Sequence, residues 1–117
     1  MDAVIYTHSD LEYSAMKQLL HEEANSVTVF RDPLDGHGHY GYAFDLVIIA
    51  LNGARGMNEV VEWADRYPDT QIIWITSDEE FVSVAIQKEI CDFLNRPYTE
   101  MQFRKSVRSA ILHIRLV

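Results

Sequence analysis

The chain has 117 residues, of which 48% are hydrophobic and 24% charged, and its formal net charge at pH 7 is -8. This composition predicts one globular domain over residues 1–117 with a core of its own. The acidic balance argues against a broad phosphate-binding surface, so we expect no direct binding to nucleic acid. No apolar run reaches the ~20 residues of a membrane span, and the first residues lack a signal-peptide pattern. We therefore expect a cytoplasmic protein without membrane contact.

Apolar runs and helical periodicity alternate along the chain. Strands are predicted over residues 3–6, 26–31, 45–51, 71–76 and 90–94. Each of the first, third, fourth and fifth strands precedes an amphipathic helix. The third strand is apolar almost throughout, as expected for a strand covered on both faces of a parallel sheet. The single cysteine, Cys91, excludes an internal disulfide and is interpreted as a small buried hydrophobe.

Capping-box patterns mark the starts of three of these helices. The pairs are Ser9 with Glu12, Ser77 with Glu80, and Thr99 with Gln102. In such a box the first side chain accepts from the backbone N–H three residues later, and the second side chain reaches back to the first residue. The turn that starts at Asn52 and Gly53 precedes the remaining helix.

The stretch 32–42, with sequence DPLDGHGHYGY, interrupts this alternation. Glycine and proline oppose a regular helix there, at a cost of about 1 and about 3 kcal/mol relative to alanine, so we expect a Gly/His loop. His37 and His39 offer two imidazoles, but a zinc site prefers three or four ligands. Together with His8 they are candidates for a metal site, and an exposed loop is the favoured interpretation.

Strands that alternate with helices predict an α/β fold with a doubly wound parallel sheet of five strands. In such a sheet a functional site lies in the crevice at the carboxyl ends of the strands. The residues at or just after those ends are Thr7, His8, Arg31, Asp32, Ala50, Thr76, Ser77, Asn95 and Arg96.

Four segments carry a resemblance to the CheY-like receiver domain of two-component response regulators over nearly the whole chain. They read VIYTHSDLEYSAMKQLL, FDLVIIALNGARGMNEV, IIWITSDEEFVSVAI and CDFLNRPYTEMQF. The third and fourth look most like receivers that precede LytTR-type DNA-binding domains, and these 117 residues contain no segment that resembles such a DNA-binding domain. The resemblance implies the strand order 2-1-3-4-5, with the 32–42 loop in place of the second helix.

The resemblance also implies a degenerate phosphorylation site. The acidic pair of a working receiver falls at Thr7 and His8, its phospho-acceptor aspartate at Ala50, its switch hydroxyl at Thr76 and its lysine at Arg96. Of these, the hydroxyl alone is kept. Magnesium needs oxygen ligands such as carboxylates, and alanine has no nucleophile, so aspartyl phosphorylation at this position is chemically impossible.

Two other acids, Asp10 and Asp78, lie close enough to strand ends to be weighed as substitute acceptors. Both fall in capping or first-turn positions, where acids are common because they complement the helix dipole. Asp45 opens its strand, so we expect it at the opposite end of the sheet.

The leading functional hypothesis is a phosphorylation-independent, receiver-like module of signalling or transcriptional control. It would act on a protein partner, or as a homodimer, through region 81–117, where Lys88, Arg104, Lys105 and Arg108 mix with Glu89, Asp92 and Glu100. The alternative is a small-ligand or metal sensor that uses the strand-end crevice and the His37/His39 loop. We expect no enzyme, because no nucleophile and base stand at a plausible spacing, and no cofactor is implied.

Overall fold

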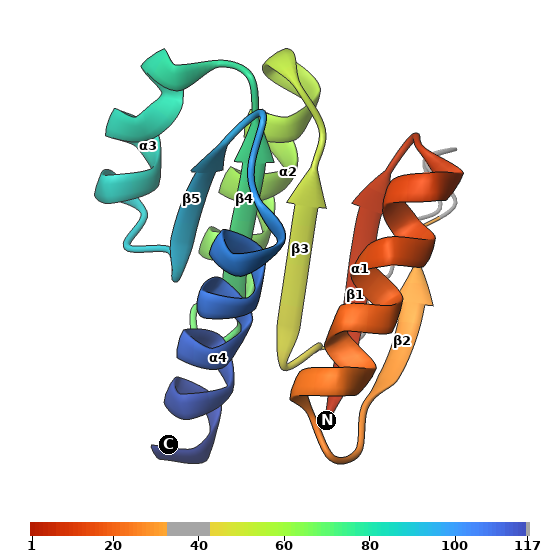
Figure 1. Cartoon of the computed structure of the whole chain (residues 1–117). Helices are drawn as coiled ribbons and strands as arrows, with labels where there is room; N and C mark the ends of the chain where they lie inside the picture. Colours follow the sequence, from red (N-terminus) through yellow and green to blue (C-terminus); the bar gives the residue numbers. More distant parts are fainter. Residues whose placement is uncertain (33–42, 117) are drawn as a thin grey trace.

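The computed structural model describes residues 1–32 and 43–116, and its centre is a five-stranded parallel sheet (Figure 1). The strands stand in the order β2-β1-β3-β4-β5, which confirms the predicted order. Their bounds are Asp2–Thr7 for β1, Thr28–Arg31 for β2, Leu46–Ala50 for β3, Gln71–Thr76 for β4 and Asp92–Asn95 for β5. Every residue of β3 is buried, as its apolar run predicted.

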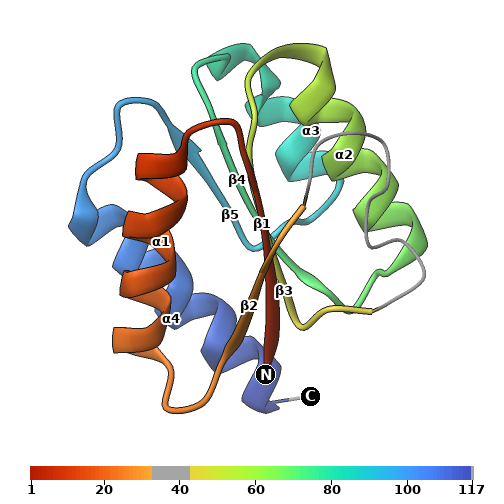
Figure 2. The same ribbon diagram turned by 90° about the vertical axis from the view of Figure 1, so that its right-hand side faces the viewer.

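Helices cover both faces of the sheet (Figure 2), and the described residues place two α-helices on each face. Helices α1 (Asp10–Glu23) and α4 (Glu100–Leu116) lie on one face. Helices α2 (Gly53–Arg66) and α3 (Val82–Gln87) lie on the other, and the short 3-10 turn η1 (Glu79–Phe81) leads into α3. The segment 33–42 falls outside the described residues, so the Gly/His loop with His37 and His39 stays a prediction.

The sheet therefore separates two apolar layers. On the α1 and α4 face, Met16 and Leu20 meet Phe103 and Val107. On the α2 and α3 face the largest side chains are the two tryptophans. Trp63 Nε1 donates a 3.0 Å hydrogen bond to the Tyr6 hydroxyl, and Trp74 stacks on Phe81 at 5.6 Å between ring centroids. Because both layers are closed, the open polar positions lie at the two ends of the sheet.

The three predicted capping boxes have three outcomes. Thr99 and Gln102 form the complete box, with reciprocal bonds of 2.8 and 3.1 Å. Ser9 accepts from the Glu12 N–H at 3.1 Å, but the Glu12 side chain turns away from the helix start.

The box predicted for Ser77 and Glu80 is wrong. Asp78 precedes η1 as its N-cap, and the Ser77 N–H donates instead to Asn52 Oδ1 at 2.9 Å. Asn52 is the N-cap residue of α2, so this bond ties two helix starts together. In a capping box the Glu80 side chain would accept from the Ser77 N–H. Here Asn52, which lies across the strand ends, already accepts from it.

Two smaller predictions concern Cys91 and the membrane. Cys91 is half-buried, and burial raises the pKa of its thiol, so the thiolate that reactivity requires is disfavoured. Within residues 1–32 and 43–116, no helix combines the length and the apolar character needed to cross a membrane.

Candidate functional site

Three of the five predicted site residues meet at the carboxyl end of the sheet. Thr7 and Ala50 are register partners on β1 and β3, and Arg96 Nη2 donates to the Ala50 carbonyl oxygen at 3.1 Å. All three border a cavity of about 360 Å³, with His8 exposed on its rim. Thr76 lies next to this group, since its carbonyl oxygen accepts from the Arg96 backbone N–H at 2.9 Å.

The carboxylate of Glu12, which was not predicted to lie in the crevice, lies among these residues. The Glu12 side chain, which is 13% exposed, forms an ion pair with Arg96. The guanidinium binds both carboxylate oxygens, at 2.6 Å from Nη1 and 3.0 Å from Nη2. The Thr7 hydroxyl donates to one oxygen at 2.7 Å and the Tyr98 hydroxyl to the other at 2.8 Å. Four donors thus fill the roughly four lone-pair positions of one carboxylate.

The pKa values of these groups follow from that arrangement. Burial on its own raises the pKa of Glu12, but the hydrogen bonds from Arg96, Thr7 and Tyr98 outweigh burial and hold the pKa below its usual range. The pKa of Tyr98 is raised, first by burial and then by its bond to Glu12. At neutral pH the site therefore contains an ionised carboxylate, a guanidinium and a neutral phenol.

A second internal acid occupies the neighbouring donors. Asp78 Oδ2 accepts from the Thr76 hydroxyl at 2.6 Å and from the Gly53 N–H at 2.6 Å. These bonds, the Thr76 bond first, lower the pKa of Asp78. Thr76 is fully buried, and its hydroxyl is directed at Asp78. The first backbone amide of α2, that of Gly53, is therefore bound by the chain's own carboxylate.

Asp10, the other acid weighed as a substitute acceptor, lies elsewhere. Its carboxylate is 91% exposed and pairs with Arg31 Nη1 at 2.7 Å. Arg31 Nη2 also donates to the Thr7 carbonyl oxygen at 2.9 Å, so this pair joins the ends of β1 and β2. Asp10 is thus a surface ion-pair partner beside the crevice.

The crevice is poorly equipped for the chemistry of a phosphorylated receiver. A metal ion held by Glu12 would have to displace donors that already fill its oxygens, and carboxylate oxygens are what Mg²⁺ requires. Within the described part of the chain, no three histidine, cysteine or acidic side chains gather around one possible metal position. The Ala50 side chain, buried at the end of β3, is a methyl group and carries no nucleophile, and the donors beside it bind an internal anion, the Glu12 carboxylate.

Sequence reasoning missed Glu12 and Tyr98 because each already had an ordinary explanation. Glu12 fits a capping box and Tyr98 follows a proline turn. One available signal was the arginine at position 96. A planar guanidinium fork matches a carboxylate with two parallel hydrogen bonds, whereas lysine acts as a point charge, so Arg96 pointed to a carboxylate partner near the crevice.

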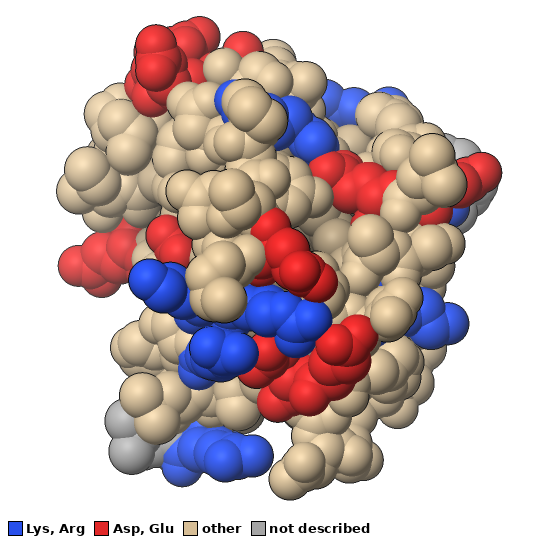
Figure 3. Space-filling view, viewed as in Figure 1, with Lys and Arg blue, Asp and Glu red and all other residues tan. Residues whose placement is uncertain are grey.

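A second charge cluster joins α1 to α4, away from the crevice. Arg104 contacts the carboxylates of Glu22 and Glu23, each at 2.9 Å, and Arg108 Nε donates to Glu23 at 2.8 Å. Figure 3 shows these acidic and basic side chains meeting over the seam between the two helices. Two of the charges predicted to serve intermolecular pairing are therefore engaged within the chain.

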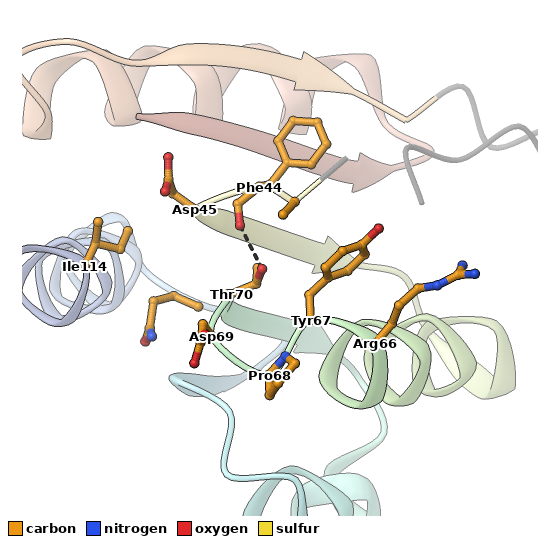
Figure 4. A pocket seen from close by; sticks show the side chains of 10 residues that line it. Phe44, Asp45, Arg66, Tyr67, Pro68, Asp69, Thr70 and Ile114 are labelled. Carbon is orange, nitrogen blue, oxygen red and sulfur yellow. Dashed lines mark hydrogen bonds between the residues drawn. The ribbon is translucent and has the colours of Figure 1, made fainter. Parts of the chain in front are cut away.

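A separate cavity of about 440 Å³ lies at the opposite end of the sheet (Figure 4). Asp45, which was expected at this end, lines it and accepts from the Asp2 N–H at 2.9 Å. The Thr70 hydroxyl donates to the Phe44 carbonyl oxygen at 2.7 Å. Asp45 and Thr70 thus bind the chain's own backbone, and this cavity lies at the other end of the sheet from the crevice.

No protein-family model and no curated protein matches the chain. Solved structures do match over nearly their whole length. The response regulatory domain of protein mrkE from Klebsiella pneumoniae has a TM-score of 0.77 at 16% identity, with 100% of both chains covered. The signal receiver domain of an HD domain-containing protein from Pseudomonas fluorescens Pf-5 has a TM-score of 0.77 at 21% identity, with 99% of this chain and 98% of that chain covered.

A third structure, a putative CpaE2 pilus assembly protein from Sinorhizobium meliloti, has a TM-score of 0.68 at 20% identity and covers 94% of this chain and 99% of that one. At these identities the likeness concerns the fold. The order of the strands and the helices on both faces agree with it, so the chain has the fold of a CheY-like response regulator receiver domain.

Proposed function

We propose that this chain is a receiver-like domain of signalling or transcriptional control that works by protein contact and without phosphorylation. The observation that carries the proposal is the state of the crevice. Ala50 stands at the acceptor position, and the donors around it are already bound to internal carboxylates: Arg96 and Thr7 to Glu12, and Thr76 to Asp78. Little remains for an incoming phosphoryl group to bind.

The experiment that tests this proposal is a titration of the purified domain with magnesium and beryllofluoride, followed by NMR. We expect no saturable shift of the resonances of Thr7, Ala50, Thr76 and Arg96. Saturable binding at these strand ends would contradict the loss of phosphate chemistry. Any receiver domain that binds beryllofluoride serves as the positive control.

The contact surface is proposed within region 81–117, and the exposed apolar side chains of α3 support it. Val82 is 43% exposed and Ile86 is 72% exposed. The charges of this region contribute less than the sequence suggested, because Lys88 pairs with Asp65 and Arg104 pairs with α1. The proposal therefore rests on an apolar α3 patch, Val82 with Ile86, bordered by charges.

Sedimentation equilibrium of the wild-type chain and of Ile86→Lys measures this contact if the partner is a second copy. We expect the substitution to weaken self-association by disrupting the α3 patch. Leu11→Lys is the matched control, because Leu11 is 85% exposed on α1, outside the region. An equal effect of both substitutions, or none from Ile86→Lys in a chain that does associate, would count against the α3 patch.

The remaining predictions concern a sensor function, the LytTR-type resemblance and enzymatic activity. The sensor hypothesis depends in part on His37 and His39, which lie outside the described residues, and the LytTR-type resemblance stays a prediction. Our expectation that the chain is no enzyme is supported by the crevice acids: Glu12 and Asp78 are held ionised, whereas an acid or base catalyst works best with a pKa near the operating pH.

A further inference from the structure

We propose that Thr7, Arg96 and Tyr98 form a binding site for a small carboxylate, and that the side chain of Glu12 is its resident ligand. The crevice is then an anion site that the chain fills for itself. This goes beyond the proposed function, which requires the absence of phosphorylation and does not require a site that can accept an outside anion.

The donors are placed by the tertiary fold. Thr7 is the last residue of β1, and Arg96 and Tyr98 follow β5, so the three side chains converge because their strands stand in one sheet. Glu12 comes from a different element, the first turn of α1. A receptor and its ligand are thus supplied by separate elements, which is why the ligand can in principle be removed while the donors stay in place.

The donor set suits a planar carboxylate. Arg96 gives two parallel bonds, one to each oxygen, and the two hydroxyls each add one more, with all four distances between 2.6 and 3.0 Å. Bidentate pairing of this kind is both stronger and more directional than contact with a point charge. Arg96 Nη2 also donates to the Ala50 carbonyl oxygen, so the guanidinium has one contact that does not depend on Glu12.

Because Arg96 is partly buried, its positive charge favours an anion bound beside it. Its side chain is 26% exposed, and Nε is buried without a hydrogen-bond partner within the described part of the chain. Removing one member of a buried ion pair leaves an uncompensated charge, which is strongly unfavourable. If the Glu12 carboxylate is deleted, the cavity beside it gives a dissolved carboxylate access to the vacated position.

The test is chemical rescue of Glu12→Ala by acetate. Thermal unfolding of this variant is measured at pH 7 in sodium acetate and in sodium chloride of the same ionic strength, so that general screening is equal. We expect acetate to raise the Tm of Glu12→Ala clearly more than chloride does. A site with a Kd of roughly 10 mM would shift the folding equilibrium about tenfold at roughly 100 mM acetate.

Glu22→Ala is the matched control. It also deletes the carboxylate of an α1 glutamate that pairs with an arginine. However, Glu22 is 43% exposed, and its partner Arg104 keeps its ion pairs with Glu23 and Glu100. We expect no acetate-specific effect on this variant, on the wild type or on the double variant Glu12→Ala/Arg96→Ala. If Glu12→Ala gains no more from acetate than from chloride, or if the double variant is rescued equally, the proposed site does not exist.

A second variant keeps the test decisive if Glu12→Ala is unfolded in both salts. Glu12→Gln retains the shape of the side chain and removes its charge, so we expect a lower Tm than the wild type and no rescue by acetate, because the amide still fills the site. A Glu12→Gln variant as stable as the wild type would show that the donors do not require an anion, and would overturn the inference. Neither result depends on beryllofluoride binding, so the two proposals can fail separately.

Discussion

Ala50 lies 3% exposed at the end of β3, and the donor side chains around it bind carboxylates from other parts of the chain. A guanidinium and two hydroxyl groups near that position would be unsatisfied without an acceptor, and buried polar groups without partners are costly. Glu12 supplies the acceptor for Arg96 and Thr7, and Asp78 supplies it for Thr76. The acceptors for these donors therefore come from α1 and from the turn after β4, while position 50 contributes a methyl group.

We predict that Ala50→Asp does not accept a phosphoryl group from acetyl phosphate in the presence of magnesium. The new carboxylate would lack the acidic pair that holds the metal, since Thr7 and His8 stand at those positions, and Arg96 is already bound to Glu12. Intact-mass spectrometry after incubation measures the modification, with an active receiver as the positive control. A phosphorylated fraction above that of the wild type would show that the crevice retains more function than its residues suggest.

We also predict a loss of stability in acid that comes from the paired carboxylates. The hydrogen bonds of Arg108 and Arg104 lower the pKa of Glu23 from 4.5 to about 2, and the pKa values of Glu12 and Asp78 are lowered as well. Because these groups bind protons more weakly in the folded state, the unfolded state is favoured as they are protonated. The free energy of unfolding should be at its plateau above about pH 4.5 and fall toward pH 2.

Urea titrations at several pH values measure this dependence. Glu23→Gln removes one of the titrating groups, so its free energy of unfolding should change less steeply between pH 4.5 and pH 2 than that of the wild type. A steeper or unchanged slope in the variant would assign the acid sensitivity to other residues.

At the scale of single elements, the start of α2 depends on one close approach. A Cβ atom on Gly56 would lie 2.0 Å from the carbonyl oxygen of Leu51. That oxygen is backbone, so it cannot rotate away, and the helix would have to shift.

We predict that Gly56→Ala lowers the free energy of unfolding by about 1–3 kcal/mol, the range for overpacking, despite the better helix propensity of alanine. Chemical denaturation measures the change. Asn58→Ala, at an exposed position of the same helix, is the control and should be neutral or slightly stabilising. A stable Gly56→Ala variant would mean that α2 can move away from Leu51 at little cost.

The seam between α1 and α4 leads to a further element-scale prediction. Arg104 is 19% exposed and contacts three glutamates, whereas Lys105 is exposed on the same helix. Arg104→Ala should lower the Tm more than Lys105→Ala at low salt, and the difference should shrink at high salt because surface charges are screened. Equal Tm values for the two variants at low salt would show that the cluster does not stabilise the packing of α4.

Local patterns predicted the elements well but their side-chain partners less well. The period of the apolar residues was sufficient to place the five strands and the flanking helices, and Thr99 with Gln102 formed the box that the pattern indicates. A capping pattern shows only what a side chain can do locally. Glu12 and Ser77 were instead bound by groups distant in sequence, Arg96 and Asn52, which a single sequence does not place beside them.

For the whole molecule, the order of the strands followed from the resemblance and was confirmed, because the alternation of strands and helices constrains the topology tightly. The same topology predicts a site at the carboxyl ends of the strands, and Thr7, Ala50 and Arg96 do lie together there. The sequence identifies alanine at position 50 directly, whereas the contacts of the two internal acids, Glu12 and Asp78, required the three-dimensional structure.

The contacts that complete the site join the two ends of the chain. Glu12 and Arg96 are 84 residues apart, and Glu23 and Arg108 are 85 residues apart. During synthesis on the ribosome, which adds about 5–20 residues per second, α1 is made several seconds before its partners. Until α4 emerges, the glutamates of α1 lack their arginine partners, and the apolar side chains of α1 that pack on α4 lack that contact. The domain should therefore reach its folded state only after α4 has left the exit tunnel, and its first helix is the segment that a chaperone would meet exposed.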